Sequence, residues 1–203
     1  DVFSADEFRR QVVAVGGNLF DAGGNTDWQD ELTQTGISQN INLSLSGAGS
    51  EKFSYFISGG YEDQEGILLN SRLRRYSGRA NLNQTGLNGR LNVDYNFTGA
   101  RTENIRPDND AIIVDMLQLN PTIPVYTEGR PTLLDDMLNP VVRNELYSDE
   151  AQNNRLLANI SPSIEIIPGL TYKLNLGIDY SVTNRDIQTE PYGLLERFEF
   201  GEL

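Results

Sequence analysis

The feature that most constrains the fold is a strict alternation of apolar and polar residues over residues 37–62. Successive side chains of a β-strand point to opposite faces, so this alternation places the apolar residues on one face and the polar residues on the other. Residues 48–51 interrupt the pattern with small and polar side chains, which predict a tight turn. We therefore expect a long β-hairpin with one apolar and one polar face.

Four later stretches repeat this alternation and predict further strands. The connections between the strands alternate in length, with short turns at 84–89 and 168–170 and longer segments at 63–74 and 100–153. Gly, Asn and Pro in the short connections favour the backbone conformations of turns. The additional predicted strands occupy residues 75–83, 90–99, 155–167 and 171–182.

The segments outside the strands carry signals for short helices. Ser4 and Glu7 have the spacing of a capping box, in which each side chain bonds the other residue's backbone N–H, and Thr26 and Gln29 repeat that spacing. A third helix is predicted over residues 110–119, which precede a proline-rich stretch. We expect these helices to lie in loops rather than in a separate helical domain.

The composition excludes several classes of site. The 203-residue chain has no cysteine and no histidine, so it cannot form disulfides, thiolate metal sites or an imidazole base. Its formal net charge of −13 argues against nucleic-acid binding, which needs clustered Lys and Arg. We expect no enzymatic activity, no cofactor and no metal site. Residue 1 is not a methionine, and we expect a processed chain or a fragment of a longer protein.

Alternating strands occur in soluble β-sheets and in transmembrane β-barrels, and three features favour the barrel. The predicted strands are long enough for a tilted strand to span a membrane, which takes about 9–11 residues. Short and long connections alternate as they do in outer-membrane barrels. Tyrosines gather near strand ends on the apolar face, where aromatic girdles lie. These tyrosines are Tyr55, Tyr61, Tyr76, Tyr95, Tyr172 and Tyr180.

We therefore predict an all-β fold, a segment of an antiparallel up-and-down transmembrane β-barrel with about six long strands. The barrel strands occupy 37–99 and 154–182. If the turn at 48–51 is periplasmic, the segments 1–36, 63–74, 100–153 and 183–203 are extracellular. The residues predicted to face lipid are Ile41, Leu43, Leu45, Tyr55, Ile57, Leu91, Val93, Leu174, Leu176 and Ile178. A soluble, secreted β-sheet module that binds glycans is the alternative.

Several motifs resemble the SusC/RagA branch of the TonB-dependent outer-membrane transporters. They are SADEF (4–8), NTDWQDEL (25–32), SQNINLSLSGAGSEKFSYFISGGYEDQEGIL (38–68), RYSGRANL (75–82) and GRLNVDYNFTGARTEN (89–104). In that family this run follows a plug domain and forms early strands of a barrel with roughly 22 strands. Six strands cannot close a barrel, so the resemblance implies that this chain does not transport by itself.

The resemblance also implies a function and its partners. The full transporter would import oligosaccharides, or peptides, across the outer membrane of a Gram-negative bacterium of the Bacteroidetes type. A SusD-like surface lipoprotein would sit on the extracellular loops. The TonB complex would drive uptake through parts of the full protein that are absent from this chain.

Four residues are candidates for contact with cargo or with the lipoprotein. Tyr126, Arg130 and Tyr147 lie in the long loop, where they can stack on a sugar or donate hydrogen bonds to it. Trp28, the single tryptophan, can either stack on a ligand or anchor its helix on neighbouring elements. The sequence leaves both interpretations of Trp28 open.

Overall fold

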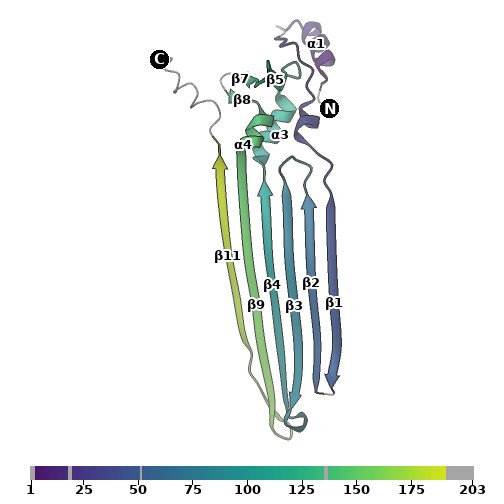
Figure 1. Ribbon diagram of the computed structural model, residues 1–203, viewed down its shortest axis with the longest axis vertical. Helices are drawn as coiled ribbons and strands as arrows, with labels where there is room; N and C mark the ends of the chain where they lie inside the picture. The colour runs from purple at the N-terminus through teal and green to yellow at the C-terminus, as the bar shows by residue number, and fades with distance from the viewer. Residues whose placement is uncertain (1–2, 18–19, 51, 135–136, 191–203) are drawn as a thin grey trace, which may run out of the picture.

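One antiparallel sheet of long strands makes up most of the molecule (Figure 1). The structure is a computed structural model, and it describes residues 3–17, 20–50, 52–134 and 137–190. The sheet order is β1-β2-β3-β4-β9-β10. β11 also pairs with β9, along the part of that strand that β10 does not reach. The strands are β1 (Ser38–Ser50), β2 (Phe53–Glu65), β3 (Arg72–Gly86), β4 (Leu91–Arg106), β9 (Tyr147–Ile167), β10 (Leu170–Lys173) and β11 (Leu176–Thr189).

This up-and-down arrangement confirms the predicted all-β class and the six long strand positions, and the sheet is not closed. β1 to β4 and β9 pair in regular register with their neighbours, with irregularities between Ala48 and Ser50 on β1 and between Leu170 and Thr171 on β10. β1 continues to Ser50, so the predicted turn at 48–51 begins too early. Residue 51 of that predicted turn lies outside the described residues.

The strands run further toward one end than the alternation predicted. The predicted loop at 63–74 is wrong at both ends, because β2 continues to Glu65 and β3 begins at Arg72. The predicted loop at 100–153 likewise gives way to strand up to Arg106 and again from Tyr147. The predicted loop from residue 183 is strand as far as Thr189. Both faces are polar in these extensions, so backbone pairing continues where the alternation has ended.

Pro162 divides the last predicted strand into β10 and β11. Proline has no N–H to give to a neighbouring strand, so the ladder between β9 and its partner is interrupted at that point. Leu174 donates its N–H to Pro162 O at 2.9 Å. The Asn175 side chain then accepts from Ser161 Oγ at 2.6 Å and from Asn159 Nδ2 at 2.7 Å. Side chains thus bridge the position where the backbone ladder fails.

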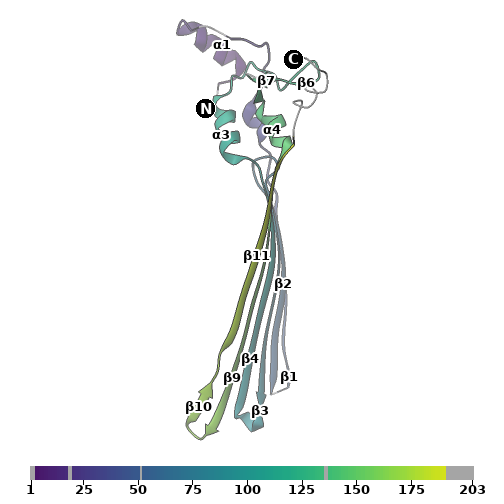
Figure 2. The ribbon, with the colours of Figure 1, turned by 90° about the vertical axis from the view of Figure 1, so that its left-hand side faces the viewer.

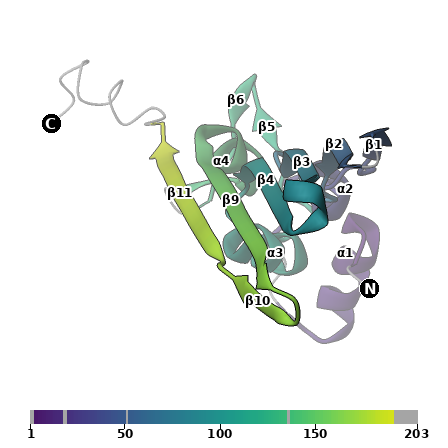
Figure 3. The same ribbon diagram turned by 90° about the horizontal axis from the view of Figure 1, so that it is seen from below.

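Seen edge-on, the sheet is a single layer (Figure 2). The view from below shows the same strands as one curved row (Figure 3). In the part of the chain that the structure describes, the α-helices gather at one end of the strands and leave both faces of the sheet uncovered. None of the described helices is long and apolar enough to cross a membrane.

The helices and short strands at this end form a cap. The short 3₁₀ helix η1 (Leu87–Gly89) lies at the opposite end, between β3 and β4. The cap comprises α1 (Ala5–Ala14), α2 (Trp28–Leu32), α3 (Asn109–Gln118), α4 (Pro140–Leu146), and the two hairpins of β5 (Tyr126–Thr127) with β6 (Arg130–Pro131) and of β7 (Leu133–Leu134) with β8 (Met137–Leu138).

The sequence signals for helix starts are partly confirmed. Ser4 and Glu7 form the predicted capping box at the start of α1. For α2 the predicted cap was wrong by one residue, because Asp27 accepts from the backbone N–H groups at the helix start. Thr26 instead donates its hydroxyl to Ile123 O at 2.7 Å, which ties α2 to the segment after α3.

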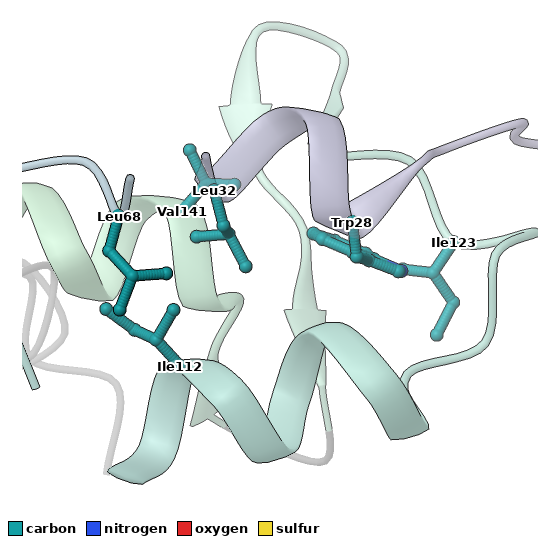
Figure 4. Packing of buried hydrophobic residues seen from close by; sticks show 6 residues of the cluster. All are labelled: Trp28, Leu32, Leu68, Ile112, Ile123 and Val141. Atoms are coloured by element: carbon teal, nitrogen blue, oxygen red, sulfur yellow. The ribbon is translucent and has the colours of Figure 1, made fainter. Parts of the chain in front are cut away.

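The buried apolar cluster lies in the cap rather than between sheet layers (Figure 4). Trp28 is 2% exposed, and its Nε1 donates to Asn120 O at 3.2 Å. The interpretation of Trp28 as a stacking residue for a ligand or partner is therefore wrong, because its ring is enclosed by other elements of the cap. The cluster consists of Trp28, Leu32, Leu68, Ile112, Ile123 and Val141.

Replacing Trp28 with alanine should unfold the cap locally and leave the sheet intact. Truncation of a buried aromatic side chain typically costs about 3–5 kcal/mol. We expect faster amide exchange in α2, α3 and α4 and unchanged exchange in β2 and β3, measured by hydrogen–deuterium exchange on the full-length protein. Val15→Ala is the control, because Val15 is 79% exposed. Unchanged exchange in the cap of the Trp28 variant would contradict this role.

Candidate functional site: the outer belt and the inner wall

The register of the sheet brings the apolar residues of the strands into rows across one face, which we call the outer face. Residues directly opposite one another in neighbouring strands share a face. One such row crosses the middle of the sheet without a single polar side chain. It contains Leu45, Ile57, Ala80, Phe97, Ala158 and Ile178.

The residues predicted to face lipid lie on this outer face. Leu43 is the most exposed of them, at 74%. Tyr55 is half-buried because its ring lies over Gly47, where an added Cβ would come within 2.8 Å of the Tyr55 hydroxyl. Leu91 and Val93 are also half-buried. The other exposed members of the set are Ile41, Leu45, Ile57, Leu174, Leu176 and Ile178. The apolar rows form a surface that we call the outer belt, and its contact with lipid stays a prediction.

A pair of tyrosines marks the end of the outer belt nearest the cap. The rings of Tyr61 and Tyr76 lie 5.2 Å apart, on opposite positions of β2 and β3. The same row continues to Arg101 on β4 and to Asn154 on β9, so it is the first row with polar members. The next row toward the cap is polar throughout: Gln39, Asp63, Arg74, Glu103, Gln152 and Asn184.

Ion pairs cover the outer face above the tyrosine pair. Asp63 accepts from Arg72 Nε at 2.8 Å and from Arg72 Nη2 at 2.6 Å, and the Tyr61 hydroxyl donates to the same carboxylate at 2.8 Å. Arg101 pairs with Glu103 on β4. Charged groups that pair in this way are suited to water or to lipid headgroups rather than to a hydrocarbon interior.

The opposite face, which we call the inner wall, is lined mainly by amide and hydroxyl side chains. Asn83 Nδ2 donates to Asp94 at 2.7 Å and to Asn92 at 3.0 Å. Arg155 holds Asp179 through two hydrogen bonds of 3.2 and 2.8 Å. The inner wall is therefore polar and cross-linked by side chains, which is the composition of a barrel face that meets an aqueous lumen.

A shallow hollow of about 190 Å³ lies on the inner wall over β1, β2 and β3. Gly60 forms part of its lining, and Glu62 lies opposite Arg75 in the register of β2 and β3. Sequence reasoning missed this hollow because its residues meet only through the pairing of three strands. Its lining from the inner wall consists of Asn40, Asn42, Gly60, Glu62, Arg75 and Ser77.

A second polar cluster links three strands at the end of the sheet nearest the cap. The Asp149 side chain is 4% exposed and accepts from Arg185 Nε and Nη2, both at 2.7 Å. Arg106 Nε lies 3.4 Å from the same carboxylate. This cluster was not predicted from the sequence, because its residues lie in strand segments that were predicted to belong to the loops 100–153 and 183–203.

The structure separates the predicted contact residues. Tyr126 and Arg130 lie on the β5–β6 hairpin, where each is exposed. Tyr147 is half-buried at the start of β9, opposite Thr189 of β11. Contact of these three residues with cargo or lipoprotein stays a prediction, whereas the burial of Trp28 removes the fourth candidate.

Comparison with known proteins places the chain in a family. No family model matches it. The "TonB-dependent receptor P3" of Formosa agariphila is 32% identical over 190 residues, which cover 87% of this chain and 19% of that protein. The "TonB-dependent receptor SusC" of Bacteroides thetaiotaomicron is 26% identical over 222 residues, which cover 95% of this chain and 22% of SusC.

Solved structures of the RagAB peptide importer also match most of this chain. The RagAB peptide importer in its closed-closed state matches 87% of this chain and 21% of the solved chain, with a TM-score of 0.64 and 25% identity. Its open-open state matches the same shares with a TM-score of 0.65. The chain belongs to the SusC/RagA family of TonB-dependent receptors. The resemblance noted in the motifs is thereby confirmed.

This SusC/RagA-family chain spans about a fifth of the length of the relatives it matches, as the shares of 19% and 22% show. The relatives are receptors and importers rather than enzymes, which confirms the expectation that the chain is not an enzyme. The antiparallel sheet corresponds to part of the barrel of these receptors.

The attachment of α1 to the loop after it should depend on pH. Arg9 donates to both oxygens of Asp21, at 2.8 and 3.0 Å, and this bonding lowers the pKa of Asp21 to about 2. A carboxylate whose folded pKa is depressed stabilises the fold above its unfolded pKa, about 3.9, and loses that contribution as the pH falls through 2. We expect amide exchange in α1, corrected for its intrinsic pH dependence, to stay slow at pH 4 and to rise toward pH 2.

Two variants separate this pair from other acid effects. Asp21→Asn should give the fast exchange of α1 already at pH 5, since the amide cannot form the ion pair. Asp6→Asn is the control, because Asp6 makes a single 3.2 Å contact with Arg9 and its side chain is 80% exposed. Identical pH profiles for the wild type and Asp21→Asn would contradict the assigned role.

Proposed function

We propose that this chain is a barrel-wall segment of an outer-membrane importer, with the outer belt in lipid and the inner wall toward the transport lumen. The observation that carries the proposal is the contrast between the two faces of one uncovered sheet. The central rows of the outer belt have no charged side chain, while the inner wall is amide- and hydroxyl-rich with paired charges. The family membership supports the same assignment.

A single-layer sheet with this composition is poorly suited to water. Exposed apolar patches on soluble proteins rarely exceed a few hundred Å², and burial of apolar area contributes about 25 cal/mol per Å². The outer belt spans all the long strands and, among the described residues, has no second layer over it. Lipid supplies an apolar medium for this face, and further strands of the full receptor satisfy the open edges by closing the barrel.

The lengths of the connections give the orientation. The short connections between β1 and β2, at 87–90 and at 168–169 join strands at the end away from the cap, whereas the connections at the cap end are the segment 66–71 and the much longer segment 107–146. Outer-membrane barrels have short periplasmic turns and longer extracellular loops, so the cap is assigned to the cell exterior. Strand length fits this assignment, because the 21 residues of β9 extend about 70 Å, well beyond the 9–11 residues that cross a bilayer.

The outer belt also fits strands that are tilted in the membrane. On β1 it begins at Ile41, but the row of Ile41 is already polar at Arg101 on β4 and at Asn154 on β9. On β9 the belt runs from Leu156 to Ile166, further from the cap. A membrane boundary that crosses the rows obliquely is expected for strands tilted by about 35–45°.

The partners follow from the family and from the position of the cap. A SusD-like surface lipoprotein would dock on the cap, where Tyr126 and Arg130 are exposed. Energy would come from the TonB complex, which would act on parts of the receptor outside this chain. SusC and the RagAB peptide importer support an oligosaccharide or a peptide as cargo. The localisation is the outer membrane of a Gram-negative bacterium of the Bacteroidetes type.

The facing of β1 can be tested with one pair of substitutions in the full-length receptor. Leu43→Arg places a cation on the outer belt, which costs about 2–4 kcal/mol near the bilayer midplane. Ser44→Arg places the same side chain on the inner wall and should be tolerated. We expect the heat-modifiable, folded receptor in outer-membrane fractions to fall sharply for Leu43→Arg and to stay near the wild-type level for Ser44→Arg.

Equal assembly of the two variants would refute the assigned facing. Recovery of the receptor as a detergent-free soluble protein would instead favour the soluble β-sheet module. A strain lacking TonB provides the functional arm, since uptake of the cargo should cease there while the receptor still assembles.

A further inference from the structure

The hollow on the inner wall contains two opposite charges on neighbouring strands that do not pair with each other. Glu62 and Arg75 are direct neighbours in the register of β2 and β3, yet the described residues provide neither with an ion pair or a side-chain hydrogen bond. Arg72, Arg155 and Arg185, by contrast, each hold an aspartate through two hydrogen bonds. A carboxylate acceptor and a guanidinium donor therefore remain available side by side.

Amide and hydroxyl groups complete the hollow. Asn42 Nδ2 donates to Asn40 Oδ1, which leaves Asn40 Nδ2 and Asn42 Oδ1 for other partners. A Cβ added to Gly60 would lie 2.5 Å from Asn42 Oδ1 and 2.8 Å from Ser77 Oγ. These polar atoms thus converge over Gly60, and a methyl group added there would push both side chains aside.

We infer that this hollow is a contact subsite for a neutral oligosaccharide on its way through the lumen. The inference rests on the proposed import function and names the class of cargo that the inner wall takes. Sugar hydroxyls both donate and accept hydrogen bonds, so adjacent hydroxyls match a surface that offers donors and acceptors close together. Here Arg75 and Asn40 donate, Glu62 and Asn42 accept, and Ser77 can do either.

The chemistry of the hollow matches peptides and anionic sugars less well. An extended peptide is recognised by adding to a free sheet edge through backbone hydrogen bonds. At the hollow, β2 pairs with β1 and β3, and β3 also pairs with β4, so the backbone of β2 and β3 is already used, and closure of the barrel would pair the free edge of β1. Anionic cargo would be repelled by the cap, because acidic residues outnumber basic ones in both 3–37 and 107–146.

The test measures binding to the purified full-length receptor that carries this chain. The probes are a labelled panel of neutral oligosaccharides, a panel of uronate-containing or sulfated oligosaccharides, and a mixed peptide pool. We expect the wild type to bind members of the neutral panel. Gly60→Ala keeps the charge but pushes the Asn42 and Ser77 side chains aside, and it should weaken that binding about tenfold, the effect of one or two lost hydrogen bonds.

A matched control lies on the neighbouring strand. Gly78→Ala adds the same methyl group where no other atom lies within 4 Å, so affinity should be unchanged. Arg75→Gln provides an independent variant that removes a donor without filling the hollow, and it should also weaken neutral-oligosaccharide binding. If Gly60→Ala fails to assemble, as judged by the heat-modifiable band, the result for Arg75→Gln decides.

The outcomes separate the subsite from the import function. Unchanged affinity in both Gly60→Ala and Arg75→Gln, or binding of only peptides or only acidic oligosaccharides, overturns the inference. TonB-dependent uptake of peptides alone would overturn the subsite and leave the import function standing. Failure of TonB-dependent uptake for every probe would overturn the proposed import function itself.

Discussion

Continuous backbone pairing across one uncovered sheet is the constraint on which the rest of the structure depends. The ladders satisfy the N–H and C=O groups between neighbouring strands, which permits these strands to lie in a medium without water. The two faces differ in composition, with apolar rows through Leu45 on one and amide-rich rows through Asn83 on the other. In the orientation that we propose, the Tyr61–Tyr76 pair lies where the hydrocarbon of the membrane gives way to headgroups and water.

The cap, unlike the sheet, is held together by a buried apolar core. It is folded around Trp28 and its neighbours. Asn70 in the β2–β3 connection donates its Nδ2 to Asn144 O of α4 at 3.1 Å, and Thr33 and Leu68 form an isolated bridge beside it. The sheet therefore carries the cap at one end while the cap keeps its own core. A platform of this kind suits a lipoprotein partner that must dock without disturbing the wall.

The sequence was sufficient for the strand order and the two faces, because a period of two is visible wherever one face is apolar. It failed where both faces are polar, as at Asp63 and Arg72, because pairing then leaves no periodic signal. The effect of Pro162 was missed, although a missing N–H donor was visible in the sequence. The burial of Trp28 and the hollow at Gly60 depend on contacts between distant segments, and only the register reveals them.

The facing of β1 can be measured directly by spin labels placed singly at residues 40–46 of the assembled receptor. The 203-residue chain contains no cysteine, so a cysteine introduced for labelling has no competitor within it. Collision with lipid-soluble oxygen and with a water-soluble nickel chelate reports the surroundings of each label. The account predicts oxygen maxima at Ile41, Leu43 and Leu45 and chelate maxima at Asn42 and Ser44, in strict alternation. Equal accessibility at adjacent positions, or the opposite phase, would contradict the claim that this sheet separates lipid from lumen.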